Sequence, residues 1–241
     1  MTLAPLGDSA VVVTLGNAID ETTLLRVRSL VAELERVKSP GIIDIVPAYA
    51  TVTVFYEIVP AGATPEPPYQ RVCRIVEEAL AKIEHRWPDL LRANLESSQS
   101  RDAQSVVRIP VCYGGEYGPD LEEVARHCKL TRDEVVSIHS EGKYGVYAIG
   151  FSPGFPYLGG LSPKLHTPRR ESPRTMVPAG SVGIGGQQTG IYPLSSPGGW
   201  QLIGRTPKPL LQLASENPAL LRVGDRVQFF QITPEEFSTW K

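Results

Sequence analysis

Apolar residues in the first half of the chain follow two periods. Runs at residues 11–15, 42–46 and 51–58 have the length and alternation of β-strands, and Pro47 separates the last two. Asp20 precedes a stretch whose apolar residues recur on one helical face, so it offers an N-cap to a helix between the first two strands. The first half therefore predicts alternating strands and helices.

The most clearly amphipathic helix follows a proline-rich stretch at residues 60–68. Its apolar residues recur at helical spacing, which favours a stripe packed in the core over a surface for a partner. These residues are Val72, Ile75, Val76, Ala79, Leu80, Ile83 and Trp87.

A polar segment without a hydrophobic period, residues 96–104, has the composition of an exposed linker. The length of 241 residues also exceeds the usual single-domain size of roughly 100 to 150 residues. We therefore predict an N-terminal α+β domain over residues 1–95, a linker over 96–105 and a second domain over 106–241.

The second half opens with a strand at residues 106–112, in which Pro110 indicates an edge position or a bulge. Thr131 and Glu134 have the spacing of a capping box at the start of a short helix. From Tyr144 onward the helical period disappears, and short apolar pieces alternate with glycine and proline. This pattern predicts a mainly β domain of closed or folded-over architecture.

Composition narrows the function classes. A formal net charge of −2 gives no overall attraction for nucleic acid or an acidic membrane, and no run reaches the roughly 18 apolar residues of a membrane span. The N-terminus does not resemble a signal peptide. Cys73, Cys112 and Cys128 are odd in number and far apart, which favours reduced thiols in a cytoplasmic protein. The four histidines lie at no metal-binding spacing, so we expect no metal site.

The loop from Gly150 to Gly160 contains four glycines and two prolines. Proline fixes φ and glycine permits close backbone approach, so such a loop can hold Phe151, Phe155 and Tyr157 in one aromatic cluster. The alternative is a rigid turn without a binding role.

Arginines gather in the segments that follow. Residues 168–174 contain three arginines next to a glycine-rich run at 177–190, and residues 196–207 add Trp200 and Arg205. Guanidinium groups bind carboxylates and phosphates through a planar fork, so the grouping predicts an anion site. The alternative is a set of solvated surface charges. The glycines match neither a P-loop nor a Rossmann turn.

Four long strings within these segments resemble the family of the 5-oxoprolinase B subunit, also called allophanate hydrolase subunit 1, which includes a sporulation-kinase inhibitor branch. They are GFSPGFPYLGGL, PRRESPR, VPAGSVGIGGQQTGIYP and SPGGWQLIGRTP. VPAY at 46–49, IPVCYGGEYGPDL at 109–121 and LRVGDRVQF at 221–229 extend the resemblance over nearly the whole chain. Ser152 departs from the pattern, in which a larger apolar residue is expected.

The resemblance implies a cyclophilin-like β-barrel as the second domain. It also implies one component of a 5-oxoprolinase complex that cleaves 5-oxo-L-proline to L-glutamate at the expense of ATP, with the C component as the closest partner and the A component as the other. Magnesium would accompany ATP at the complex active site, and no tightly bound cofactor is expected. Two alternatives stay open: an inhibitor that binds a sensor histidine kinase, and a component of an allophanate or urea amidolyase system.

The resemblance and the chemistry together nominate site residues. Arginines suit a substrate carboxylate and a transferring phosphoryl group, whereas a histidine near a helix end serves as an acid or base, or simply as a cap or core residue. The catalytic candidates are His139, Arg174 and Arg205. The candidates for binding substrate or nucleotide are Phe155, Tyr157, Arg169, Ser181, Gln188, Thr189, Tyr192 and Trp200.

Overall fold

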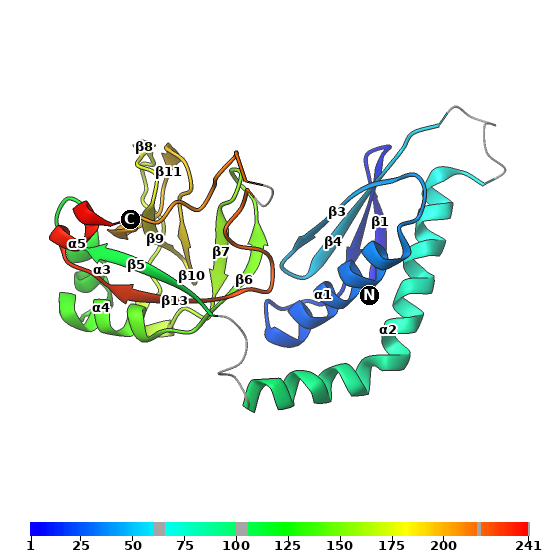
Figure 1. The fold of residues 1–241 in the computed structure, drawn as a ribbon, viewed down its shortest axis with the longest axis horizontal. Coiled ribbons are helices and arrows are strands. Elements are labelled where there is room, and N and C mark those ends of the chain that lie inside the picture. The colour runs from blue at the N-terminus through cyan, green and yellow to red at the C-terminus, as the bar shows by residue number, and fades with distance from the viewer. Residues whose placement is uncertain (60–65, 100–105, 216–217, 241) are drawn as a thin grey trace. The chain divides into compact units, whose positions relative to one another are not determined.

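The computed structural model describes residues 1–59, 66–99, 106–215 and 218–240, without the side chains of 94–99. The chain divides into two compact units, Met1–Gln104 and Ser105–Lys241 (Figure 1).

The N-terminal unit packs two helices on an antiparallel sheet with the strand order β1, β2, β4, β3. Valines of the strands and one face of each helix form a single core, as the two apolar periods predict. The elements are β1 (Thr2–Leu6), β2 (Ala10–Thr14), α1 (Glu21–Val37), β3 (Ile42–Ala48), β4 (Thr51–Tyr56) and α2 (Pro68–Gln99).

Local signals place the ends of α1 and of the β3–β4 hairpin. The side chain of Asp20 accepts a hydrogen bond of 2.7 Å from the backbone N–H of Thr23, which confirms the predicted N-cap. The prediction that Pro47 separates two strands is wrong, because β3 continues through it and Pro47 lies opposite Val52. The chain reverses after Ala48 instead, where Tyr49 has a positive φ of 53°.

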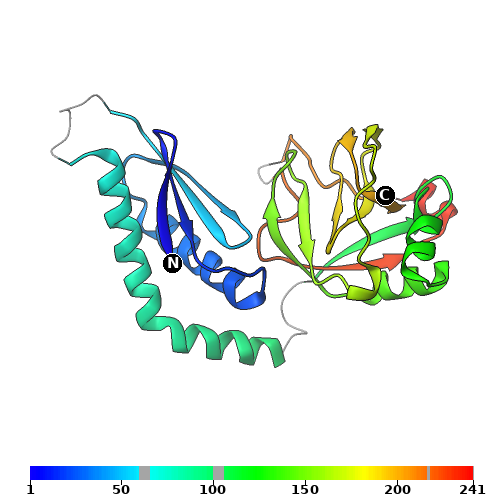
Figure 2. The same cartoon turned by 180° about the vertical axis from the view of Figure 1, so that it is seen from behind.

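The helix α2 continues to Gln99 and so enters the predicted linker; residues 100–105 lie outside the described residues. It contains Pro88, which lacks an N–H and crowds the preceding turn. Figure 2 shows that the helix bends, and an interior proline is a sufficient cause.

The C-terminal unit contains a closed barrel, and seven strands of the described residues form it. Their order is β6, β13, β5, β12, β9, β10, β7, and pairing between β6 and β7 closes the ring. Only β13 and β5 run parallel. The strands are β5 (Val107–Tyr113), β6 (Tyr144–Ile149), β7 (Pro156–Gly159), β9 (Ser181–Gly185), β10 (Gln188–Ile191), β12 (Gln201–Arg205) and β13 (Arg226–Gln231).

Short elements decorate the barrel. A two-stranded antiparallel sheet of β8 (Arg174–Val177) and β11 (Ser196–Gly198) projects from one end, away from α4, in both Figure 1 and Figure 2. The helical elements are α3 (Leu121–Cys128), α4 (Arg132–Glu141), η1 (Pro163–Leu165) and α5 (Pro234–Thr239). The barrel confirms the mainly β domain that the glycine and proline pattern predicts, and of the two predicted architectures it is the closed one.

Two sequence signals in this unit have different outcomes. The capping box of Thr131 and Glu134 is present in both directions at the start of α4. Pro110, however, lies in an interior strand rather than at an edge. The strand β12 pairs only with Cys112 and Tyr113 of β5, so it does not extend as far as the proline, which has no N–H to offer.

Candidate functional site

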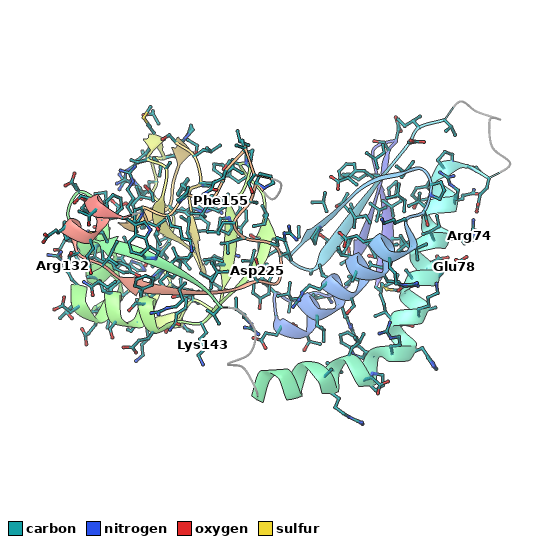
Figure 3. All side chains as sticks on the ribbon, viewed as in Figure 1. Arg74, Glu78, Arg132, Lys143, Phe155 and Asp225 are labelled. Carbon is teal, nitrogen blue, oxygen red and sulfur yellow. The ribbon has the colours of Figure 1, made fainter. Side chains whose placement is uncertain are left out.

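Aromatic rings gather at the glycine-rich loop. The ring of Phe155 lies 4.9 Å from Tyr157, 5.1 Å from Tyr192, 5.5 Å from Trp200 and 5.5 Å from Phe151, all in edge-to-face geometry. The predicted cluster of Phe151, Phe155 and Tyr157 is confirmed, with two rings added from later segments. Figure 3 shows Phe155 in the C-terminal unit, among the side chains of the barrel.

Backbone hydrogen bonds within the loop hold this cluster in place. The N–H of Phe155 donates to the carbonyl of Ser152, and the N–H of Gly150 donates to the carbonyl of Phe155, both at 3.0 Å. Phe151 has a φ of 70° and a ring that is 64% exposed. A phenylalanine with left-handed backbone is uncommon, so the loop keeps an exposed ring in a strained position.

Glycines of the following run make room for the rings. A Cβ added at Gly185 would stand 2.5 Å from the Trp200 ring, and one added at Gly198 would stand 2.4 Å from the Tyr192 hydroxyl. Gly185 belongs to β9, which pairs with strands on both sides. These glycines therefore serve close packing of the aromatic cluster.

Two arginines of the predicted anion site share one buried carboxylate. Asp120, whose side chain is 6% exposed, accepts hydrogen bonds on Oδ1 from Arg174 Nη2 at 2.7 Å and from Arg170 Nη1 at 3.2 Å. Its Oδ2 accepts from the backbone N–H of Leu202 at 2.6 Å. We call Asp120, Arg170 and Arg174 the Asp120 cluster. Arg170 was not a candidate; instead the neighbouring Arg169 stands 5.9 Å from the Trp200 ring.

Sequence reasoning also missed Asp120. An aspartate just before a helix is usually a cap, and Asp120 precedes α3. Its side chain makes no capping hydrogen bond and turns to the arginines instead. The signal available in the sequence was the string GPDL within the family landmarks, but the string does not reveal the partners.

The pKa of Tyr192 reflects both its burial in the aromatic cluster and the charge of nearby arginines. Burial raises the pKa of the Tyr192 hydroxyl, and the backbone of Trp200 and the guanidinium groups of Arg169 and Arg174 offset part of that rise. Tyr192 therefore lies where the rings and the positive charges meet.

Arg205 lies elsewhere. Its Nε donates to the carbonyl of Ala179 at 2.8 Å, and its guanidinium stands 6.0 Å from the ring of Phe237 in α5. Gln201 and Arg205 occupy opposite ends of β12, about 13 Å apart at the usual rise of a strand. The structure does not bring Arg205 into the Asp120 cluster.

His139 is fully buried inside the unit, and its ring stacks on Phe229. Its Nδ1 lies 2.8 Å from the Tyr113 hydroxyl, and its Nε2 lies 3.0 Å from Oγ1 of Thr189. The Thr189 hydroxyl donates to the carbonyl of Gly183, so Nε2 must carry the ring hydrogen while Nδ1 accepts from Tyr113. Burial lowers the pKa of His139 to about 3, and the imidazole is neutral.

The remaining candidates occupy the barrel strands. Ser181 begins β9, is 2% exposed and accepts at its carbonyl from the N–H of Tyr192. Gln188 begins β10, is half-buried and lies opposite Gly185. The backbone hydrogen bonds of Ser181 join it to Pro178 and Tyr192, outside the Asp120 cluster. Within the described residues, no three His, Cys, Asp or Glu side chains gather to hold a metal ion, and no helix is long and apolar enough to cross a membrane.

Comparison with known proteins places this arrangement in a family. Residues 1–221 match the family model of the carboxyltransferase domain, subdomain C and D. The chain is 45% identical to the 5-oxoprolinase B subunit of Bacillus subtilis, over 98% of this chain and 95% of the relative. It is 42% identical to the 5-oxoprolinase B subunit of Escherichia coli O157:H7, over 93% of each. The chain belongs to the 5-oxoprolinase B-subunit family.

A solved structure shows how a member of similar fold is arranged in a longer chain. The crystal structure of TTHA0988 superposes on 92% of the present chain with a TM-score of 0.72 and 35% sequence identity. The match spans 40% of the TTHA0988 chain. In that protein, a B-subunit fold is therefore part of a larger polypeptide.

For a member of the B-subunit family, the candidate residues divide by position. One group joins the Asp120 cluster and Arg169 to the aromatic residues Phe155, Tyr157, Tyr192 and Trp200, most of which are buried. His139 and Thr189 lie in the interior, and Arg205 lies toward α5. We therefore take the first group as the candidate site.

Proposed function

We propose that this chain is the B component of an ATP-dependent 5-oxoprolinase, which opens the lactam of 5-oxo-L-proline to give L-glutamate together with the A and C components. The observation that carries the proposal is the similarity over almost the full length of both chains to proteins named as the B subunit of 5-oxoprolinase. A match of this extent involves both units and not the barrel alone.

The candidate site has the chemistry that such a reaction requires. An unstrained lactam is a poor electrophile, and phosphorylation of its amide oxygen by ATP makes the carbonyl carbon reactive. The substrate also carries a carboxylate that needs a fixed cation. Arg174 and Arg170 supply cations, and the charge of Arg174 acts on the hydroxyl of Tyr192 in the aromatic cluster.

Magnesium with ATP is not assigned to this chain. Asp120 is the buried carboxylate of the site, and arginines already occupy its Oδ1. This donor set does not fit a divalent cation, whose ligands are carboxylates and other oxygen atoms free of such partners. No step of the proposal therefore passes through a metal on this chain, and ATP enters as a reactant of the complex.

Reconstitution tests the proposal. The chain is mixed with the purified A and C components, and release of glutamate from 5-oxo-L-proline is followed with and without ATP. We expect ATP-dependent release only when all three components are present. Absence of release from the complete, correctly assembled mixture would contradict the proposal.

The two arginine candidates make a matched pair within that assay. Arg174→Ala is expected to lower the rate of glutamate release by about 100-fold, the usual effect of removing one positioned charge donor from an active site. Arg205→Ala is expected to change the rate little, because Arg205 faces α5. If both variants fold and lose the same fraction of the rate, membership of the Asp120 cluster does not determine which arginine serves the reaction.

Partner capture separates the alternative functions. An immobilised chain that recovers the C component of 5-oxoprolinase from a mixture supports the proposal. Recovery of a sensor histidine kinase in its place favours the inhibitor alternative, and ATP-dependent turnover of allophanate or urea with no turnover of 5-oxoproline favours the amidolyase alternative.

A further inference from the structure

The Asp120 cluster contains donors that no described residue satisfies. Arg174 Nη1 and Arg170 Nε are buried, and neither has a hydrogen-bond partner within the described part of the chain. A buried N–H group without a partner costs free energy and is rare in folded proteins. Two of them on neighbouring guanidinium groups therefore need an explanation.

The atoms without partners lie in two chain segments that run side by side, 168–174 and 198–201. The backbone N–H of Arg170 donates to the carbonyl of Gly199 at 2.7 Å, and Arg174 pairs with Gly198 between β8 and β11. Gln201 donates from Nε2 to the carbonyl of Pro168 while its Oε1 has no partner among the described residues. The segment 168–174 thus lies along 198–201, and the free donors lie at their junction.

Charge at the junction matches one negative group. Arg170 and Arg174 together carry two positive charges, and Asp120 neutralises one of them. The side chains of Arg170 and Arg174 are 35% and 23% exposed, while their two free donors are buried, so a ligand reaches these donors only if neighbouring side chains move aside. The hydroxyl of Tyr192, in the aromatic cluster, lies within the electrostatic influence of Arg174.

We propose that Arg170 and Arg174 bind the carboxylate of a small ring compound through the donors that Asp120 leaves free, and that Asp120 is the positioning residue of this site. By fixing Nη2 of Arg174 and Nη1 of Arg170, Asp120 directs Nη1 of Arg174 and Nε of Arg170 toward the ligand. Arginine is suited to this task because its fork is planar and rigid. The identity of the ligand as 5-oxo-L-proline rests on the proposed function.

Direct binding to the full chain tests the site without the other components. The probes are 5-oxo-L-proline, 2-pyrrolidinone, which is the same lactam ring without the carboxylate, and inorganic phosphate, each titrated calorimetrically. We expect 5-oxo-L-proline to bind roughly 10- to 100-fold more tightly than 2-pyrrolidinone, the range for hydrogen bonds to a charged group. Equal affinity for the two lactams, or no binding of either, overturns the proposal. So does tighter binding of phosphate than of 5-oxo-L-proline at the same arginines.

Variants separate positioning from simple charge. Arg174→Lys keeps the charge but loses the fork, and it is expected to remove most of the preference for the carboxylate. Asp120→Asn is expected to do the same, although it makes the region more positive. If Asp120 only neutralises charge, Asp120→Asn will instead bind the carboxylate more tightly, and the positioning role is refuted.

Glu122→Gln is the matched control. Glu122 also pairs with an arginine, Arg132, and lies in α3 close to Asp120, but both partners are exposed. This variant is expected to bind both lactams like the wild-type chain. Thermal unfolding of every variant shows which ones remain folded, and Arg174→Lys retains the test if Asp120→Asn does not fold.

The site and the proposed function fail in different ways. Glutamate release by the complex that is unaffected by Arg174→Lys and Asp120→Asn refutes the site and leaves the proposed function standing. Carboxylate-dependent binding to the chain, combined with no release of glutamate by the complex, supports the site and refutes the proposed function.

Discussion

Two buried polar networks in the C-terminal unit differ in how completely their hydrogen bonds are satisfied. Around His139, both ring nitrogens have partners, and the Thr189 hydroxyl donates a hydrogen bond to the backbone carbonyl of Gly183. Around Asp120, the carboxylate is fully engaged, but Arg170 and Arg174 each keep a buried donor without a partner in the described chain. The first network is closed, and the second is open on one side.

A structural polar residue and a site residue can therefore be distinguished by whether all the hydrogen bonds of their network are satisfied. A closed network lowers the cost of burying polar atoms and holds elements together; here it joins α4, β5 and β10. An open network retains hydrogen-bonding capacity for another molecule at a cost in stability. On this criterion we propose a structural role for His139, a catalytic candidate from the sequence, and a role in ligand binding for the Asp120 cluster.

The largest expected effect comes from opening the closed network. His139→Ala removes a ring from the core and leaves the Tyr113 and Thr189 hydroxyl groups without that partner. We expect the free energy of unfolding of this unit to fall by about 3 to 5 kcal/mol, as for other large-to-alanine changes in cores. Urea denaturation measures it.

The exposed His127 provides the control, since His127→Ala removes the same side chain from the surface of α3. Its effect is expected to stay within about 0.5 kcal/mol. If His139→Ala proves as stable as the wild-type chain and yet abolishes glutamate release, His139 is catalytic and the distinction between the two networks is wrong.

A smaller effect is expected from acid. The pKa of His139 is about 3 in the folded chain and close to the ordinary 6.5 in the unfolded chain. Between these values the unfolded chain binds the extra proton, so the free energy of unfolding falls as the pH falls. From pH 6.5 to pH 4.5 the loss is about 2 kcal/mol, measured by urea denaturation at a series of pH values.

Glu33, the carboxylate of the N-terminal unit with the most perturbed pKa, does not contribute to the loss of stability between pH 6.5 and 4.5. Arg36 and Lys82 lower the pKa of Glu33 to about 2, and their stabilisation is lost only below the ordinary carboxyl pKa near 4.5. A chain with His139→Ala should therefore have a flatter profile between pH 6.5 and 4.5. An unchanged slope in that variant would assign the effect to other groups.

The sequence predicted the parts of this architecture that depend on local rules. The N-cap at Asp20, the capping box of Thr131 and Glu134, and the aromatic loop around Phe155 each follow from residues close together in the chain. The glycines and prolines that separate the short apolar runs after Tyr144 predicted a closed or folded-over β domain, and the family resemblance implied a barrel.

The candidate site could not be predicted in full, because its contacts join residues that are far apart in the sequence. Arg205 was grouped with Trp200 because both lie in one short string, yet a strand carries them to separate places. Adjacent arginines cannot be ranked by sequence, and Arg170 rather than Arg169 binds Asp120. Asp120 itself lies 54 positions before Arg174, so only the folded barrel brings them together.

The smallest expected effect concerns Phe151, in the loop that holds the aromatic cluster. Phe151 keeps a left-handed backbone and a largely exposed ring. Phe151→Gly and Phe151→Ala both remove the ring, but only glycine adopts this φ without strain. We expect the glycine variant to be more stable than the alanine variant by about 1 kcal/mol, measured by urea denaturation.

The rate of glutamate release is not expected to follow the stability order of the two Phe151 variants. If the ring is kept at a cost in strain because it contributes to the site, both variants will lower glutamate release equally, although their stabilities differ. A release rate that tracks stability would instead show that Phe151 only supports the loop. An alanine variant as stable as the glycine variant would show that no strain is stored at this position, and the exposed ring would then need no functional explanation.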